Sequence, residues 1–271
     1  MSETKERLDV LLVSLGLAES REKAKAYIMS GEVFVDDKRC DKAGQTVRAD
    51  ANIEVRSKRQ KYVSRGGYKL EKALDEFGID PKGLHVLDAG ASTGGFTDCL
   101  LQRGADKVYA ADVGYGQLAW SLRSDIRVVC LERTNARSIT VETLGESVDM
   151  TVMDLSFISL KLVLPAVYNV LKPEGRVVCL VKPQFEAGRE KVGKKGVVRD
   201  PAVHVEVLEK FINDAQELDF SILGITFSHI KGPEGNIEYL GYLKKGSGIN
   251  NAPDIAALVE ASHSSLDHPK K

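Results

Sequence analysis

The chain has 271 residues, 43 % hydrophobic and 28 % charged, which is enough for a full hydrophobic core in one or two domains. This composition excludes global disorder, and no apolar run approaches the ~18 residues of a membrane-spanning helix. The four cysteines lie far apart and form no CxxC pair, so the sequence predicts neither a disulfide framework nor a metal site, and it fits a reducing cytoplasm.

The net charge of −1 hides a strong segregation of charge along the chain. Residues 56–72 contain seven Lys or Arg and one acid, giving +6, and residues 182–199 contain six and two, giving +4. The remainder therefore carries −11. Local basic fields attract a polyanion whatever the total charge is, so the pattern indicates contact with nucleic acid. Two solvated basic loops would give the same pattern.

Residues 1–60 are expected to form a small separate domain. Helical periodicity covers 7–15, and Ser20 is placed to cap a second helix that runs to Ser30. Short strands are expected at 33–35 and 52–55. Two short helices with basic side chains, followed by short strands, can form a small RNA-binding surface, although an ordinary amphipathic helix pair fits the same residues. The basic side chains that it offers are Arg7, Arg21, Lys23 and Lys25.

Residues 61–67 are basic and end in Arg65-Gly66-Gly67, which is typical of an interdomain linker, with Arg65 a further RNA contact. From residue 68 to 248 the pattern alternates between strand and helix, which predicts a doubly wound α/β domain with a parallel sheet. Residues 249–271 are polar and are expected to form a weakly structured tail. The expected strands are 85–88, 107–112, 127–132, 148–154, 176–182 and an antiparallel terminal pair, 222–229 and 237–244; the expected helices are 69–77, 96–102, 158–171 and 201–218.

The turn after the first of these strands organises the domain. It has the spacing Asp-x-Gly-x-x-x-Gly-Gly over Asp88, Gly90, Gly94 and Gly95, whereas a dinucleotide fingerprint has Gly-x-Gly-x-x-Gly. Glycines let a ligand approach the backbone, and the helix start at Phe96 presents free N–H groups. A leading acid suits a ligand with positive charge or hydroxyls, such as S-adenosylmethionine (SAM), which has no phosphate.

A second acid supports the SAM interpretation. Asp112 ends the next strand, 24 residues after Asp88, where a carboxylate can accept hydrogen bonds from a ribose diol. We expect Asp88, Gly90 and Gly94 to shape the methionine end of the pocket. The complete set of expected cofactor contacts is Asp88, Gly90, Ala91, Ser92, Gly94, Gly95, Phe96, Asp112, Val113, Asn135, Ala136 and Asp154, with Asn135 and Ala136 near the adenine.

Charged residues at the ends of several strands are the candidates for catalysis. Asp154 ends the fourth strand and Lys182 the fifth, while Glu238 opens a reversed strand and so reaches the same edge. Lys69, on the helix that enters the sheet, is the fourth candidate. Two lysines and two acids can hold a hydroxyl, and we expect Lys182 to orient it and to stabilise developing oxyanion charge. Whether Lys182 or water removes the proton stays open.

Methyl transfer to an acceptor other than a hydroxyl oxygen is associated with different sequence motifs. Methylation of an exocyclic amine goes with an Asn/Asp-Pro-Pro-aromatic turn, whereas this chain has Asp154-Leu155-Ser156-Phe157. Methylation of a pyrimidine carbon needs a cysteine nucleophile, and none lies near Asp154 or Lys182 in the sequence. Oxygen is therefore the predicted acceptor.

Four segments together carry a resemblance to a known family: Ser64–Leu70, Asp88–Asp98, Asp154–Ser159 and Val181–Glu186. With them, the chain over essentially its whole length closely resembles the TlyA (hemolysin A) family of bacterial ribosomal RNA cytidine 2′-O-methyltransferases. The resemblance implies an FtsJ-like, Rossmann-like methyltransferase domain behind an αL-type RNA-binding domain, SAM as cofactor, and 16S and/or 23S ribosomal RNA as substrate. It also implies a catalytic tetrad of Lys69, Asp154, Lys182 and Glu238.

Two other functions remain open at this stage. A non-catalytic RNA-binding or ribosome-assembly factor could keep the fold without using SAM, and the hemolysin name implies membrane lysis. The sequence contains no membrane span and no strongly amphipathic cationic helix to support lysis. We expect ribosomal subunits as partners, with no membrane, no metal and no obligate protein partner.

Overall fold

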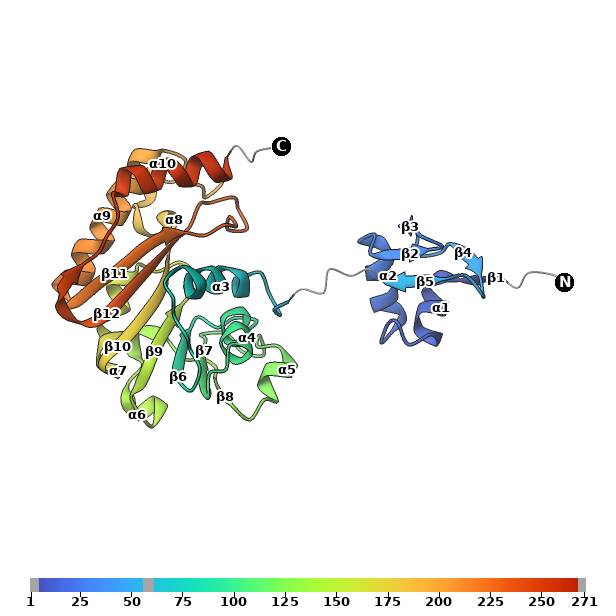
Figure 1. Cartoon of the computed structure of the whole chain (residues 1–271), viewed down its shortest axis with the longest axis horizontal. Coiled ribbons are helices and arrows are strands. Elements are labelled where there is room, and N and C mark those ends of the chain that lie inside the picture. Colours follow the sequence, from blue (N-terminus) through green and yellow to red (C-terminus); the bar gives the residue numbers. More distant parts are fainter. Residues whose placement is uncertain (1–4, 56–60, 268–271) are drawn as a thin grey trace. The chain divides into compact units, whose positions relative to one another are not determined.

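The structure, a computed structural model, describes residues 5–55 and 61–267 (Figure 1). The chain divides into two compact units, Met1–Lys61 and Tyr62–Lys271. The buried hydrophobic residues form one cluster in the first unit and two clusters in the second, one on each face of its sheet. Because each unit has its own core, each is described by itself.

The N-terminal unit combines two helices with short strands. Ser20 caps the second helix as predicted, since its Oγ accepts a hydrogen bond from the Lys23 amide at 3.2 Å. Asp36 and Asp37 both adopt positive φ, 47° and 63°, which is the backbone of a tight hairpin turn. Three of the strands were not predicted, because each of them contains at most one apolar residue and is otherwise charged or polar. The elements are β1 (Lys5–Arg7), α1 (Leu8–Ser14), α2 (Arg21–Met29), β2 (Val33–Val35), β3 (Lys38–Cys40), β4 (Thr46–Arg48) and β5 (Ile53–Val55).

The C-terminal unit is built on a seven-stranded sheet of order β11-β12-β10-β9-β6-β7-β8. Strands β10, β9, β6, β7 and β8 are parallel, and β12 runs antiparallel between β10 and β11. The predicted doubly wound sheet with a reversed terminal strand is confirmed. Its strands are β6 (His85–Ala89), β7 (Lys107–Ala111), β8 (Val128–Leu131), β9 (Val148–Met153), β10 (Leu171–Val181), β11 (Phe220–Phe227) and β12 (Tyr239–Asn250).

Helices cover both faces of this sheet because successive strand residues point to opposite sides. In β10, Val177 and Cys179 belong to the cluster under α7, α9 and α10, whereas Val178 and Leu180 belong to the cluster under α3 and α4. The helices are α3 (Gly66–Glu76), α4 (Gly95–Gln102), α5 (Trp120–Arg123), α6 (Val141–Leu144), α7 (Leu164–Val170), α8 (Pro183–Glu186), α9 (Pro201–Glu217) and α10 (Ile255–Leu266), with 3-10 turns η1 (Ala136–Ser138), η2 (Leu160–Leu162) and η3 (Arg189–Lys191).

The expectation of a weakly structured tail over 249–271 is wrong for its described part. Strand β12 continues to Asn250, and α10 follows it. Asp254 caps α10, because its Oδ1 accepts a hydrogen bond from the Ala257 amide at 3.0 Å. Val259 is 1 % exposed and Ser262 is fully buried, so the helix is amphipathic, with a short polar residue on its buried face. Because Ser262 interrupts the apolar positions on this face, the helical periodicity of α10 could not be recognised from the sequence.

Two further expectations are corrected. The linker proposed over 61–67 ends earlier, because α3 begins at Gly66. The single helix proposed over 158–171 is the turn η2 followed by α7. Pro165 stands in the first turn of α7, where its missing N–H has no partner to lose, so it starts the helix and does not kink it.

Candidate active site at the carboxyl edge of the sheet

The glycine turn after β6 crosses close to the end of β9. Gly90 has a φ of 89°, and a Cβ atom there would lie 2.8 Å from the carbonyl oxygen of Asp154. Gly94 has a φ of 98° at the N-cap of α4, where a Cβ atom would meet the side chain of Leu122 at 2.2 Å. Both positions therefore require glycine, one so that two strand ends approach each other and one so that α5 packs on α4.

Asp88, the acid that leads the turn, lies in the interior. Its side chain is fully buried, its Oδ2 accepts a hydrogen bond from Thr97 Oγ1 at 2.6 Å, and its Oδ1 has no protein partner. Burial raises the pKa of this carboxyl to about 7. Asp88 lines neither of the cavities described below, so it ties β6 to α4 from within the core.

The raised pKa of Asp88 predicts a pH-dependent stability. The pKa in the folded protein lies above the ordinary value of 3.8, so the contribution is present at low pH and is lost as the pH rises through about 7. Between pH 5 and pH 8 we expect the free energy of unfolding of the wild type to fall by about 2–3 kcal/mol relative to that of Asp88→Asn. Urea titrations measure it, with exposed Asp106→Asn as the control; a constant difference between wild type and Asp88→Asn contradicts it.

A cavity of about 460 Å³ opens at the carboxyl edge of the sheet and holds all four candidate catalytic side chains. Asp154 follows β9 and Lys182 follows β10, while Glu238 immediately precedes the antiparallel β12 and Lys69 belongs to α3. The antiparallel register, in which Val181 faces Tyr239, is what brings Lys182 and Glu238 to one edge. The full lining is Ser64, Arg65, Gly66, Lys69, Gly90, Ala91, Ser92, Thr93, Gly95, Phe96, Asp154, Ser156, Lys182, Lys231, Pro233 and Glu238.

The four charges form two ion pairs. Lys182 Nζ lies 2.6 Å from Asp154 Oδ1 and 3.3 Å from Ser156 Oγ. Lys69 Nζ donates to Glu238 Oε2 at 2.5 Å. Lys69, Lys182 and Glu238 are 6 %, 7 % and 1 % exposed, so both pairs are held in a poorly solvated site. Desolvated donors of this kind act strongly on charge that develops beside them.

A second cavity, of about 430 Å³, adjoins the first. Asp112 enters it from the end of β7, and its two carboxylate oxygens accept hydrogen bonds from the amides of Ser92 at 2.8 Å and Gly114 at 2.7 Å. Asn135, which also lines this cavity, caps η1. The full lining is Gly90, Ser92, Ala111, Asp112, Val113, Gln117, Thr134, Asn135, Ala136, Asp154, Leu155, Ser156, Phe157, Ile158 and Val163. Gly90, Ser92, Asp154 and Ser156 line both cavities, so the two share a wall.

The expected cofactor residues therefore separate into four groups. Asp112, Val113, Asn135 and Ala136 line the second cavity, and Gly90, Ser92 and Asp154 line both. Ala91, Gly95 and Phe96 line only the first cavity, and Asp88 and Gly94 line neither. Sequence reasoning missed the apolar wall of Leu155, Ile158 and Val163, which has no signal separate from core packing, and the rim residues Ser64, Lys231 and Pro233.

The basic residues expected to contact RNA have different surroundings. Arg7 Nε and Arg21 Nη2 each lie 3.0 Å from a carboxylate oxygen of Asp9, and both arginine side chains remain about half exposed. Hydrogen bonding to Arg7 is the main reason that the pKa of buried Asp9 is lowered to about 2. Lys23 and Lys25 are exposed on α2, and Arg65 donates to the Lys231 carbonyl at 3.1 Å. Arg7 and Arg21 thus stabilise their unit as well as presenting charge.

A parallel sheet with a reversed last strand, a glycine turn after its first strand and an acid after its second define a Rossmann-like methyltransferase fold. Residues 62–245 match the FtsJ-like methyltransferase family, and residues 6–53 match the S4 domain. The chain belongs to the TlyA (hemolysin A) family of FtsJ-like methyltransferases.

Similar proteins cover nearly the whole chain. The 16S/23S rRNA (cytidine-2′-O)-methyltransferase TlyA of Mycobacterium tuberculosis is 46 % identical over 96 % of this chain and 97 % of its own length. Hemolysin A of Brachyspira hyodysenteriae is 45 % identical over 87 % and 98 %. A solved structure from Streptococcus thermophilus, provisionally named a hemolysin, is 44 % identical over 98 % of each chain, with a TM-score of 0.76. Within residues 5–55 and 61–267 no helix is both long and apolar enough to cross a membrane.

Proposed function

We propose that this protein transfers a methyl group from SAM to the 2′-hydroxyl of a cytidine ribose in ribosomal RNA. The observation that carries the proposal is the pair of buried lysine–carboxylate contacts in a cavity that shares a wall with a second, partly apolar cavity. The name of the Mycobacterium tuberculosis relative, 46 % identical, supports both the ribose oxygen and the RNA.

The second cavity fits SAM. The Asp112 carboxylate can accept hydrogen bonds from ribose hydroxyls with lone pairs that its backbone contacts leave free, and Asn135 and Ala136 offer a polar and an apolar surface to adenine. Gly90, Ser92, Asp154 and Ser156 line both cavities, so a ligand in the second cavity can direct one end toward the first. SAM, when bound, supplies an electrophilic methyl carbon.

Lys182 is proposed to act on the acceptor hydroxyl in the first cavity. Lys182 Nζ contacts Asp154 Oδ1 at 2.6 Å, and an ammonium has three N–H donors, so donors remain for the acceptor hydroxyl. The ammonium can therefore hold the hydroxyl oxygen by donating to it and can stabilise the negative charge that grows as its proton leaves. The proton is released to water or, if Lys182 is transiently neutral, to Lys182.

Lys69 and Glu238, which line the same cavity, are proposed to orient the ribose. Glu238 can accept a hydrogen bond from a sugar hydroxyl while it keeps Lys69 in place. Two fixed ion pairs would thus confine the acceptor, and correct positioning alone can lower a barrier by about 7–11 kcal/mol.

RNA capture is proposed to divide along the chain. Residues 1–60, through Arg7, Arg21, Lys23 and Lys25, would bind RNA phosphates, and residues 68–248 would transfer the methyl group. The S4 match over residues 6–53 supports this division. Arg65 and the basic segment 182–199 would extend the surface beside the active site. The proposed partners are 16S and/or 23S RNA within ribosomal subunits, in the reducing cytoplasm, with no obligate protein partner.

Cofactor binding is tested by replacing Asp112. The Asp112→Ala variant should bind SAM with a free energy about 1–3 kcal/mol weaker, the usual scale for losing a charged hydrogen-bond partner. Asp112→Asn keeps one acceptor oxygen, so its affinity for SAM should fall between that of the wild type and that of Asp112→Ala. Isothermal titration of SAM measures the change, with exposed Asp106→Ala as the control. Unchanged affinity in Asp112→Ala would remove this residue from the cofactor site.

The proposed reaction is tested with ribosomal subunits from cells that lack the protein. Incubation with purified protein and SAM should add 2′-O-methylcytidine, which mass mapping of the RNA locates. A methyl group found on a base contradicts the ribose assignment. A protein that binds RNA but not SAM would instead be an assembly factor, and dye release from liposomes would support the lytic activity that the hemolysin name implies.

A further inference from the structure

The loop between β11 and β12, residues 228–238, forms one wall of the first cavity. Lys231, Pro233 and Glu238 from this loop all line the cavity. Asn236 is 2 % exposed and fastens the loop, since its Oδ1 accepts from the Val198 amide at 3.0 Å and its Nδ2 donates to the Gly196 carbonyl at 2.8 Å. The loop that carries Glu238 is therefore held on the side of the 188–200 segment.

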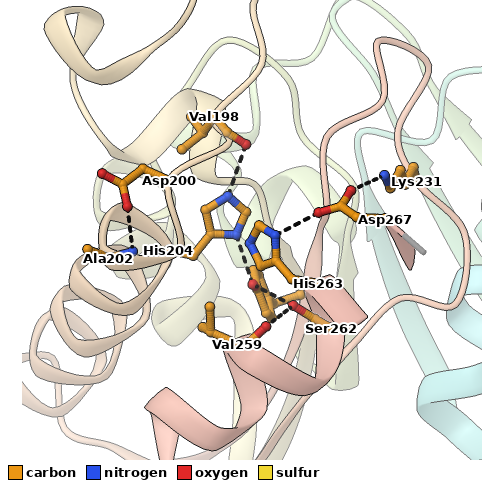
Figure 2. A network of polar contacts seen from close by, with 10 residues as sticks. Val198, Asp200, Ala202, His204, Lys231, Val259, Ser262, His263 and Asp267 are labelled. Atoms are coloured by element: carbon orange, nitrogen blue, oxygen red, sulfur yellow. Dashed lines mark hydrogen bonds and ion pairs between the residues drawn. The ribbon is translucent and has the colours of Figure 1, made fainter. Parts of the chain in front are cut away.

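Helix α10 holds the same loop from the other side. Asp267, the C-cap of α10, contacts Lys231 Nζ through Oδ1 at 2.5 Å and His263 Nδ1 through Oδ2 at 2.7 Å (Figure 2). The Lys231 carbonyl also accepts a hydrogen bond from Arg65 Nη2 at 3.1 Å. Lys231 is thus held at both ends, by its backbone from the start of α3 and by its ammonium from the end of α10.

A second, buried contact joins α10 to the strand that follows Glu238. The Tyr239 hydroxyl lies 3.0 Å from Ser262 Oγ of α10 and 2.8 Å from His204 Nδ1 of α9. His204 Nε2 lies 3.1 Å from the Val198 carbonyl, so Nε2 carries the proton and Nδ1 accepts from Tyr239. This network fixes where β12 begins, and the Asp267–Lys231 contact then sets how the loop before it lies.

We propose that α10 belongs to the acceptor site and that Asp267 is a positioning residue, which holds Lys231 where its ammonium meets a phosphodiester next to the acceptor ribose. The proposal rests on the proposed function, because it takes RNA as the occupant of the first cavity. Lys231 has three N–H donors, and Asp267 uses one of them, so two are left for phosphate oxygens. Lys231 is 28 % exposed at its side chain, within reach of an incoming strand.

If Asp267 only neutralises Lys231, Asp267→Asn should strengthen RNA binding, whereas if Asp267 positions Lys231, the same substitution should weaken it. If Asp267 only neutralised Lys231, removing its negative charge would tighten the binding of a polyanion. If Asp267 positions Lys231, the released side chain loses its orientation. The KM for ribosomal subunits should then rise by about three- to tenfold, the modest scale of a partly exposed ion pair, while kcat and the Kd for SAM stay near wild type.

The experiment compares Asp267→Asn, Lys231→Met and the double variant, with Glu260→Gln, an exposed carboxylate on the same helix, as the control. Lys231→Met should raise KM at least as much as Asp267→Asn and should reduce the slope of log affinity against log salt by about 0.7–0.9, one phosphate contact. The double variant should be no worse than Lys231→Met, because Asp267 acts through Lys231.

Three results would overturn the proposal. The first is a KM for ribosomal subunits in Asp267→Asn that stays at or below the wild-type value. The second is a double variant in which the effects of the two substitutions add. The third is a loss of SAM affinity as large as the rise in KM, which would mean general damage to the fold. A wild type that transfers no methyl group contradicts the proposed function instead. In that case fluorescence anisotropy with ribosomal RNA still tests Asp267 and Lys231, through the same salt slopes and the same double variant.

Discussion

The Lys182→Ala variant should lose about 10²–10³-fold in kcat, the scale seen when one preorganised donor to developing oxyanion charge is removed. Lys182 is 7 % exposed and contacts Asp154 at 2.6 Å in the cavity assigned to the acceptor. Because that cavity is separate from most of the proposed SAM site, the affinity for SAM should be nearly unchanged. The affinity for RNA should also be nearly unchanged, because most of the proposed phosphate contacts come from other basic residues. Single-turnover methylation and isothermal titration separate the two effects.

The Lys182→Arg variant should also fail. A guanidinium is larger than an ammonium, cannot become neutral and presents its donors in a planar fork, which the narrow space between Asp154 and Ser156 does not match. Lys107→Ala, at the opposite edge of the sheet, is the matched control. Near-normal turnover in the arginine variant would mean that positive charge alone suffices, and near-normal turnover in the alanine variant would leave Lys182 without a role in the reaction.

Removal of residues 1–60 should weaken RNA binding by about 10–100-fold at moderate salt and should flatten the salt dependence by up to about 0.9 for each lost phosphate contact. The methyltransferase unit should remain folded and should bind SAM normally, because its core and both cavities lie within Tyr62–Lys271. Filter binding at several salt concentrations measures the first effect, and circular dichroism with SAM titration measures the second.

The deletion is a cleaner test than replacing the arginines of the N-terminal unit. Arg7 and Arg21 both pair with buried Asp9, so Arg7→Ala or Arg21→Ala would leave a buried carboxylate with fewer partners and destabilise the unit. Lys23→Ala with Lys25→Ala, both exposed on α2, removes charge without that complication. Full activity on ribosomal subunits without residues 1–60 would contradict the proposed role of this unit.

The sequence alone determined the class of fold and most of the polar residues at the site. Parallel strands are recognisable in the sequence as apolar runs that end in a charged residue. Because their carboxyl ends meet at one edge of the sheet, the positions of Asp112, Asp154 and Lys182 in the sequence are enough to place these residues at that edge. The reversed last strand could be inferred too, which brought Glu238 to the same edge.

Tertiary packing decided what local pattern could not express. Asp88 leads the glycine turn like a ligand contact, yet its side chain points into the core and bonds to Thr97, because alternation along β6 sets its direction. Helix α10 was missed because its buried face includes Ser262, whose partner Tyr239 is 23 residues away in the sequence. The contact between Lys231 and Asp267 spans 36 residues, and only the packing of α10 beside the loop creates it.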